Sequence, residues 1–301
     1  MKDLFNNEYK INKPIRLIEL FAGIGSQAMA LRNIGANFEH YRVIEFDKYA
    51  IKSYNTIHGT NFETSDIRNV RGLDLGIVDC EKFTYLLTYS FPCQDLSVAG
   101  LGKGMKKGNG TRSGLLWEVE RLLNETENLP QVLLMENVPQ VHGKKNLADF
   151  NAWMDFLKSK GYQNFWQDLN AKDYGVAQNR KRCFMVSILS KDFINFEFPE
   201  KIELKKVMKD YLEDTVDEKY YINNEKALKL IERLIMDGEI KNCTDKITCA
   251  SQDKTGKNGK FLTMDELKLK DINKKLSSTI CAEVYKGFGK SNDNAIIVKK
   301  D

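Results

Sequence analysis

Four short stretches of this chain hold residue types that can carry chemistry. They are Phe21-Ala22-Gly23-Ile24-Gly25, Ser90-Phe91-Pro92-Cys93-Gln94, Glu136-Asn137-Val138 and Gln178-Asn179-Arg180-Lys181-Arg182. In that order they supply a backbone that a ligand can approach closely, a thiol nucleophile, a carboxylic acid and a pair of guanidinium groups. Each stretch alone is weak evidence. Their occurrence together in one chain favours an enzyme.

The turn around Gly23 and Gly25 is suited to holding a ligand against backbone. It follows an apolar run and precedes a helical pattern, so its amide groups would lie at a helix N-terminus. It lacks the third glycine of a dinucleotide-binding turn, and an ordinary tight turn explains it equally well. Glu45, at the end of the next expected strand, could accept hydrogen bonds from ribose hydroxyls, although such carboxylates are commonly only solvated. Asp66-Ile67 follow the region of a third strand, where Asp66 could meet an adenine amine.

Cys93 follows an expected strand at 85–89, and Pro92 fixes the approach of the chain. A lone cysteine at a strand end is usually a small buried hydrophobic residue. Here the next residues are polar and the chain then enters a loop. This context favours a thiol that faces a cleft.

Together, these motifs resemble those of the DNA cytosine-5 methyltransferase family over about residues 16–188. The resemblance implies transfer of a methyl group from S-adenosylmethionine to C5 of a cytosine in double-stranded DNA, with S-adenosylhomocysteine as product and no metal. It implies that Cys93 adds to C6 of the base and that Glu136 supplies a proton at N3. It also implies that Arg182 contacts O2 of the base and that Arg180 organises the active-site backbone. The alternatives are a chance triplet for Glu136 and a surface or phosphate-contacting pair for the arginines.

The resemblance also selects two sets of binding residues. The residues expected to bind the cofactor are Phe21, Gly23, Gly25, Glu45, Asp66, Ile67, Pro92 and Leu116. A core role for Leu116 is at least as good an explanation. The residues expected to contact DNA are Gln94, Ser97, Lys103, Lys106, Lys107, Arg112, Asn137 and Gln178.

The segment 97–113 contains five glycines, four basic residues and no acidic residue. Such a segment is typical of a mobile loop that closes over a phosphate backbone, and a plain surface loop has the same composition. Because a base inside a duplex cannot reach Cys93, the target nucleotide must be flipped out of the helix. A closing basic loop fits that requirement.

Short apolar runs alternate with helical patterns over residues 15–188. We expect strands at 15–20, 41–45, 85–89, 132–135 and 183–189, and helices at 27–34, 47–57, 115–124 and 147–160. Strands that alternate with helices predict an α/β fold with a doubly wound, mostly parallel sheet. The resemblance identifies it as the Rossmann-like fold of S-adenosylmethionine-dependent methyltransferases, with a catalytic domain of residues 1–190.

The sequence changes in character after about Ser190. Lysine becomes abundant, and one amphipathic helical pattern remains at 227–235 among segments rich in glycine, asparagine and lysine. We therefore expect a second, smaller and less regular domain over residues 191–301. The resemblance implies that it is a target recognition region that reads base edges in the major groove.

The composition of the 301 residues is that of a globular protein, with 42% hydrophobic and 29% charged residues. No apolar run approaches the ~20 residues of a membrane span and no signal peptide is recognisable, which favours a cytoplasmic protein. The resemblance implies that it is bacterial or phage-encoded and associated with DNA. Six scattered cysteines indicate neither a zinc site nor a disulfide framework. A net charge of +4 is compatible with DNA binding without requiring it.

The C-terminal part departs from the family pattern. Members follow the recognition region with a basic segment and a helix led by Gly-Asn that closes the cofactor pocket, and neither is recognisable before Asp301. Three interpretations stay open: a split or truncated enzyme completed by a second chain, a non-catalytic DNA- or cofactor-binding remnant, and a small-molecule methyltransferase. The first predicts weak cofactor binding and little methyl transfer by residues 1–301 alone. The third leaves Glu136, Arg180 and Arg182 without a role.

Overall fold

The computed structural model describes residues 9–96, 103–211, 213, 248–250 and 295–297. The chain divides into two compact units. Met1–Leu169 and Lys181–Pro199 form the first unit, and Asn170–Arg180 and Glu200–Asp301 form the second. The chain therefore leaves the first unit and returns to it before the second unit is complete.

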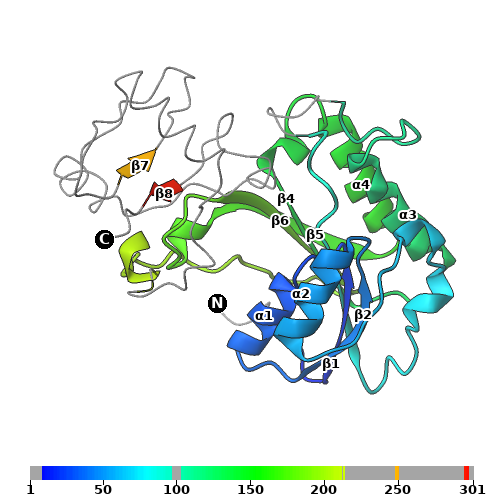
Figure 1. Ribbon diagram of the computed structural model, residues 1–301. Coiled ribbons are helices and arrows are strands. Elements are labelled where there is room, and N and C mark those ends of the chain that lie inside the picture. The colour runs from blue at the N-terminus through cyan, green and yellow to red at the C-terminus, as the bar shows by residue number, and fades with distance from the viewer. Residues whose placement is uncertain (1–8, 97–102, 212, 214–247, 251–294, 298–301) are drawn as a thin grey trace, which may run out of the picture. The chain divides into compact units, whose positions relative to one another are not determined.

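A six-stranded sheet forms the centre of the first unit, in the order β2-β1-β3-β4-β6-β5 (Figure 1). The strands are β1 (Ile15–Leu20), β2 (Phe38–Ile44), β3 (Thr84–Tyr89), β4 (Val132–Asn137), β5 (Tyr162–Asn170) and β6 (Lys181–Leu189). β1 is parallel to β2 and to β3, and β3 is parallel to β4. β6 is antiparallel to β4, so the start of β6 lies beside the end of β4.

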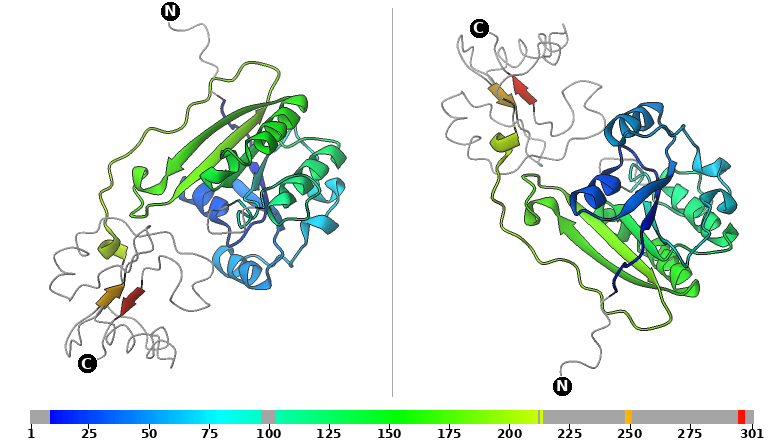
Figure 2. Two further views of the ribbon diagram at one scale, coloured as in Figure 1. Left: turned by 90° about the horizontal axis from the view of Figure 1, so that it is seen from above. Right: turned by 90° about the horizontal axis from the view of Figure 1, so that it is seen from below.

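Helices cover both faces of the sheet (Figure 2). They are α1 (Ser26–Asn33), α2 (Lys48–His58), α3 (Leu116–Glu125) and α4 (Leu147–Ser159). Leu17 and Leu86 pack with Ala28 of α1 in one core cluster. Their neighbours Ile18 and Leu87 point to the other face and belong to the larger cluster with α3 and α4. Because successive side chains of a strand alternate between faces, a sheet covered on both sides requires apolar runs of the kind seen at β1 and β3.

Local sequence explains how the helices begin and pack. The Asp47 side chain caps α2 by accepting hydrogen bonds from the backbone amides of Tyr49 at 2.7 Å and Ala50 at 3.1 Å. Helix α3 turns one apolar stripe toward the core, formed by Leu116, Val119, Leu122 and Leu123. In α4, the fully buried Trp153 donates its indole hydrogen to Tyr89 Oη at 3.1 Å, so that its one polar atom is satisfied.

The α/β fold and the helices and strands expected over residues 15–188 are confirmed, with element ends that differ by a few residues. Two features were not expected. β5 was missed, because this strand carries mostly polar and half-exposed side chains and so lacks an apolar run. The strand around Cys183 was expected without a direction, and it is antiparallel to its neighbour β4 in an otherwise mostly parallel sheet. The helix expected at 227–235 lies outside the described residues.

In the described part of the second unit, Tyr174 forms a β-bridge with Ile202, and Lys201 Nζ lies 3.0 Å from Asp173 Oδ2. A short antiparallel pair joins β7 (Thr248–Ala250) and β8 (Ala295–Ile297). The domain boundary expected near residue 190 stays a prediction.

Among the described helices of the whole chain, none has the length and apolarity needed to cross a membrane.

Candidate active site

The expected site residues of the first unit lie at one edge of the sheet. The parallel strands β1, β2 and β3 end there, and the glycine turn, Glu45 and the Cys93 loop directly follow them. β4 ends at the same edge with Glu136 as its penultimate residue. Because β6 is antiparallel, Arg182 enters the sheet where Glu136 leaves it. The carboxyl ends of parallel strands are where α/β proteins bind ligands.

The glycine turn (Phe21–Gly25) has the left-handed backbone of a tight turn, with φ of 57° at Phe21, 57° at Gly23 and 79° at Gly25. Glu45 braces it: one carboxylate oxygen accepts from the backbone amide of Gly23 at 2.8 Å, and the other accepts from Asp47 N at 2.8 Å. A Cβ added at Gly23 would meet no atom within 4 Å, so a ligand has room there. Gly25 is the N-cap of α1 and provides no side-chain cap. This geometry fits a ligand with a ribose and a charged tail.

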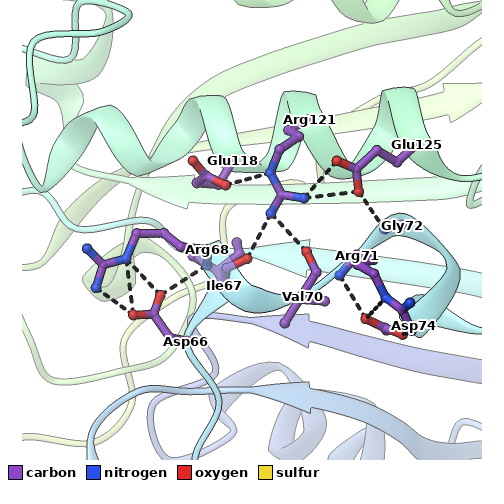
Figure 3. Close-up of polar contacts among 10 residues, drawn as sticks. All are labelled: Asp66, Ile67, Arg68, Val70, Arg71, Gly72, Asp74, Glu118, Arg121 and Glu125. Atoms are coloured by element: carbon purple, nitrogen blue, oxygen red, sulfur yellow. Dashed lines mark hydrogen bonds and ion pairs between the residues drawn. The ribbon is translucent and has the colours of Figure 1, made fainter.

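Asp66 and Ile67 are held next to Glu45, because Ser65 N donates to the backbone oxygen of Glu45 at 2.8 Å. Asp66 caps the 3₁₀ turn η1 (Ile67–Asn69) and accepts from Arg68 N at 3.0 Å. Its carboxylate also pairs with the Arg68 guanidinium, which holds the pKa of Asp66 below its usual range (Figure 3). Asp66 is therefore an ionised acceptor.

Arg121 of α3 anchors this turn (Figure 3). Its guanidinium donates to the carbonyl oxygens of Ile67 at 3.0 Å and Val70 at 2.9 Å. Glu118 and Glu125 hold the same guanidinium at 2.7 and 2.9 Å. Arg121 was not among the expected site residues; acidic residues three positions before and four after it on a helix were the available signal. Leu116, at the start of α3, is fully buried in the larger core cluster.

Side-chain hydrogen bonds fix the two residues that directly precede Cys93. Asn137 donates its side-chain amide to the backbone oxygen of Phe91 at 3.0 Å. Ser113 donates its hydroxyl to the backbone oxygen of Pro92 at 2.7 Å. Cys93 itself is only partly buried. Because Asn137 follows Glu136 directly and Phe91 lies two residues before Cys93, the first bond ties the thiol loop to the strand that carries the carboxylate.

Glu136 and Arg182 form an ion pair, with Arg182 Nε 3.0 Å from Glu136 Oε1. Both side chains keep part of their surface accessible, 20% and 17% respectively. The pair therefore remains open to a ligand at the sheet edge.

Arg180 and Gln178 belong to the second unit. There the Arg180 carbonyl accepts from Ala171 N at 3.0 Å, and Arg180 N donates to the Gln178 carbonyl at 3.0 Å.

Next to this pair lies a second charged group, which the sequence did not reveal because its members are far apart along the chain. His142 Nε2 and Lys181 Nζ lie 2.9 and 3.1 Å from the two carboxylate oxygens of Asp168. Together with Cys183, His142 and Asp168 place three possible metal-ligand atoms within 4.8 Å of one another. Lys181 already neutralises the carboxylate, however, and burial raises the pKa of the Cys183 thiol to about 12. We assign this group a structural role: it holds β5 and β6 at the end of β4.

The described part of the segment 97–113, residues 103–113, is held by hydrogen bonds within the first unit. Asp95 accepts from the backbone amide of Arg112 at 2.9 Å, and its carbonyl accepts from Gly104 N at 3.0 Å. The indole of Trp117 donates to the Met105 carbonyl at 2.6 Å. Hydrogen bonds thus fix both ends of residues 103–113. Ser97 lies outside the described residues.

Comparison with known proteins decides the family. The model of the C-5 cytosine-specific DNA methylase family matches residues 15–292. The chain belongs to this family. It is 37% identical over 266 residues to the orphan methyltransferase M.SssI of Spiroplasma monobiae, an alignment that covers 70% of this chain and 68% of that one. It is 34% identical over 257 residues to the type II methyltransferase M2.ScrFI of Lactococcus lactis, with 70% and 71% covered.

Solved structures show the same fold. A crystal structure of the Dnmt2 methyltransferase of S. pombe matches with a TM-score of 0.53 at 23% identity, over 73% of this chain and 66% of that one. The methyltransferase EhMeth of Entamoeba histolytica matches with a TM-score of 0.56 at 21% identity, over 74% and 67%. The Rossmann-like fold expected from the sequence is confirmed.

The expected DNA-contacting residues of this methylase differ in their surroundings. Lys103 and Lys106 are exposed. Lys107 pairs with Glu120 at 2.7 Å. Two further contacts join expected residues to the protein itself: Arg112 donates to the side chain of Gln94 at 2.8 Å, and the 2% exposed Asn137 bonds to backbone. The direct DNA contacts stay a prediction.

One exposed aromatic residue at the methylase site escaped the sequence analysis. Phe46 follows Glu45 directly and is 72% exposed. Single exposed apolar side chains are common on protein surfaces, so the position of Phe46 beside Glu45, rather than its exposure, makes it a candidate to cover a bound ring. Its position, one residue after a carboxylate at a strand end, was the signal that could have identified it.

Proposed function

We propose that this chain transfers a methyl group from S-adenosylmethionine to C5 of a flipped cytosine in double-stranded DNA, through a covalent bond between Cys93 Sγ and C6 of the base. The observation that carries the proposal is the hydrogen bond from Asn137 to the Phe91 carbonyl. It joins the thiol loop to β4, the strand of Glu136, and Glu136 forms the ion pair with Arg182 of β6 described above. A thiol and a carboxyl group thus lie at one edge of a fold that matches the family, which supports the proposal.

The glycine turn and its neighbours support a cofactor role. We assign the ribose hydroxyls to Glu45 and the adenine amine to Asp66, with Phe46 as the ring that covers the adenine. The open space beside Gly23 and the uncapped start of α1 suit the charged amino-acid end of S-adenosylmethionine. When bound, S-adenosylmethionine supplies an electrophilic methyl group on a sulfonium.

The residues of the ion pair and the thiol loop would carry the chemistry on the base. Cys93 loses its proton and adds to C6, while Glu136 gives a proton to N3, so that the ring does not carry the negative charge. C5 of the resulting enamine then takes the methyl group. Loss of the C5 proton, departure of the Cys93 thiolate and return of the N3 proton to Glu136 restore the aromatic ring and the acid. Arg182 would hold O2 of the base while Glu136 holds N3.

The DNA would lie against the basic segment 103–112 of the first unit. Lys103, Lys106, Lys107 and Arg112 are proposed to contact phosphates, with Lys107 leaving Glu120 to do so. Residues 191–301 are proposed as the target recognition region. The double-stranded DNA substrate follows from the family to which the chain belongs.

The test is a covalent adduct with duplex DNA that contains 5-fluorocytosine in place of the target cytosine, in the presence of S-adenosylmethionine. Fluorine at C5 cannot leave as a proton, so the Cys93 bond to C6 should persist and survive denaturing electrophoresis. Cys93→Ala should form no adduct, whereas Cys80→Ala, which alters another partly buried free thiol, should form as much as the unaltered chain. An adduct that persists in Cys93→Ala would contradict the assignment.

A further inference from the structure

A group of polar side chains lies beside the glycine turn. It contains Glu19 of β1, His40 of β2, and Tyr54 and His58 of α2, and thus includes two of the chain's three histidines. The ring centroids of Tyr54 and His58 lie 4.5 Å apart, and those of His40 and His58 lie 4.8 Å apart. None of these side chains has a role in the chemistry proposed above.

Two of these rings touch the turn itself. A Cβ placed on Gly25 would lie 2.3 Å from His58 Nε2 and 2.6 Å from the ring of Tyr54, so the main chain of the turn rests on them. His58 Nε2 also lies 3.1 Å from the carbonyl oxygen of Ile24. Because a carbonyl can only accept, Nε2 must carry the hydrogen of this bond. The bond holds the residue between Gly23 and Gly25, where the cofactor is proposed to bind.

A hydrogen-bond chain fixes Tyr54, and therefore the ring on which His58 rests. Tyr54 Oη lies 2.5 Å from Glu19 Oε2 and 2.6 Å from His40 Nδ1. Tyr54 and Glu19 are both fully buried. Burial, followed by the charges of His58 and Arg32, lowers the pKa of His40. A neutral His40 can complete this chain without bringing another charge into the interior.

We propose that His58 is a positioning residue for the cofactor: held by Tyr54, it fixes the Ile24 carbonyl and thereby the shape of the glycine turn. The proposal rests on the proposed S-adenosylmethionine site. The described contacts of His58 are with the glycine turn, Tyr54 and His40, and none of them involves the thiol loop. We therefore expect it to act on cofactor binding and to leave the chemical step unchanged.

Two variants separate the hydrogen bond from the bulk of the ring. His58→Phe keeps an aromatic ring but cannot donate to Ile24, whereas His58→Gln keeps a donor and loses the ring. Loss of one hydrogen bond to a partly buried carbonyl should raise the dissociation constant for S-adenosylmethionine about tenfold in His58→Phe. His58→Gln should stay within about threefold of the unaltered chain. Thr56→Ala, an exposed change in the same helix, serves as the matched control.

Binding is measured by isothermal titration of S-adenosylmethionine, and turnover by methyl incorporation at saturating cofactor. Turnover in His58→Phe should be nearly unchanged, and thermal unfolding should show that each variant is folded; His58→Ala replaces His58→Phe if it is not. Equal cofactor affinity in His58→Phe and the unaltered chain would overturn this assignment alone. Failure of the unaltered chain to bind S-adenosylmethionine would overturn the proposed function and this assignment with it.

Discussion

At the edge of the sheet where β1 to β4 end, one half is held by main-chain groups and the other by charged side chains. In the first half, which we call the turn half, the Gly23 amide binds Glu45 and backbone bonds join Glu45 to Ser65. In the second, which we call the ion-pair half, Glu136 pairs with Arg182. Beside them, His142 and Lys181 both pair with Asp168.

The two halves should therefore respond to different kinds of substitution, one to changes of shape and the other to changes of charge. The turn half depends on backbone conformation, so the addition of single atoms should disturb it. The ion-pair half depends on charge, so replacements of equal shape but altered charge should disturb it.

The largest expected effect is on the ion-pair half. Glu136→Gln keeps the shape of the side chain but cannot supply a proton, so the single-turnover rate of methyl transfer should fall ~10²–10⁴-fold while DNA affinity changes little. Asp168→Asn, a neighbouring carboxylate that is not proposed to touch the base, should cost less than about tenfold. A Glu136→Gln chain with weakened DNA binding and an unchanged single-turnover rate would make Glu136 a structural residue.

The next effect tests the turn half. Gly25→Ala adds one carbon where φ is 79° and where it would lie 2.3 Å from His58 Nε2. We expect the free energy of unfolding to fall by ~2–4 kcal/mol from backbone strain and overpacking together, with weaker cofactor binding. Gly35→Ala is the control, since φ is 68° there and no atom lies within 4 Å of the added carbon. Denaturant unfolding that gives equal losses for the two variants would remove the contact with His58 as a cause.

Glu19 is the charged exception beside the turn half. Burial raises its pKa to about 7, although the hydrogen bond from Tyr54 opposes the shift. A carboxyl group whose pKa is higher in the folded chain stabilises it at low pH, and this stability is lost as pH rises from the unfolded value, near 4.5, through about 7. Glu19→Gln should therefore gain stability relative to the unaltered chain between pH 5 and 8, by at most ~3 kcal/mol. Parallel stability curves of the two chains over this range would contradict the assignment.

The smallest effect concerns the basic segment. Replacing Lys106 and Lys107 by Ala should weaken binding to cognate and non-cognate duplexes alike, and should lower the salt dependence of binding by about one to two charges. The change should be modest because Lys107 gives up its ion pair with Glu120 when it binds DNA. A measured shift in sequence preference at constant salt slope would mean that these lysines contact base edges.

Sequence patterns predicted the turn half better than the ion-pair half. The apolar runs of β1 and β3 and the residues that follow them are local signals, and they placed Gly23, Glu45 and Cys93 at one edge. Which side chains meet at that edge depends on strand register and direction, and the antiparallel β6 was not expected. For that reason Glu136 and Arg182 were selected separately, without their ion pair. The partners of Asp168 were missed, because they lie on segments distant in sequence.

The position of β6 has a consequence for how the protein is made. β6 lies between β4 and β5 in the sheet, yet it follows both in the chain. On the ribosome, β4 is made before the strand that pairs with its outer edge, so this edge keeps unpaired amides and carbonyls until β6 has been made and released. A translational pause before residue 181 would lengthen the exposure of this edge and favour aggregation of the nascent chain, whereas a pause after residue 199 would come when every strand of the sheet has been made.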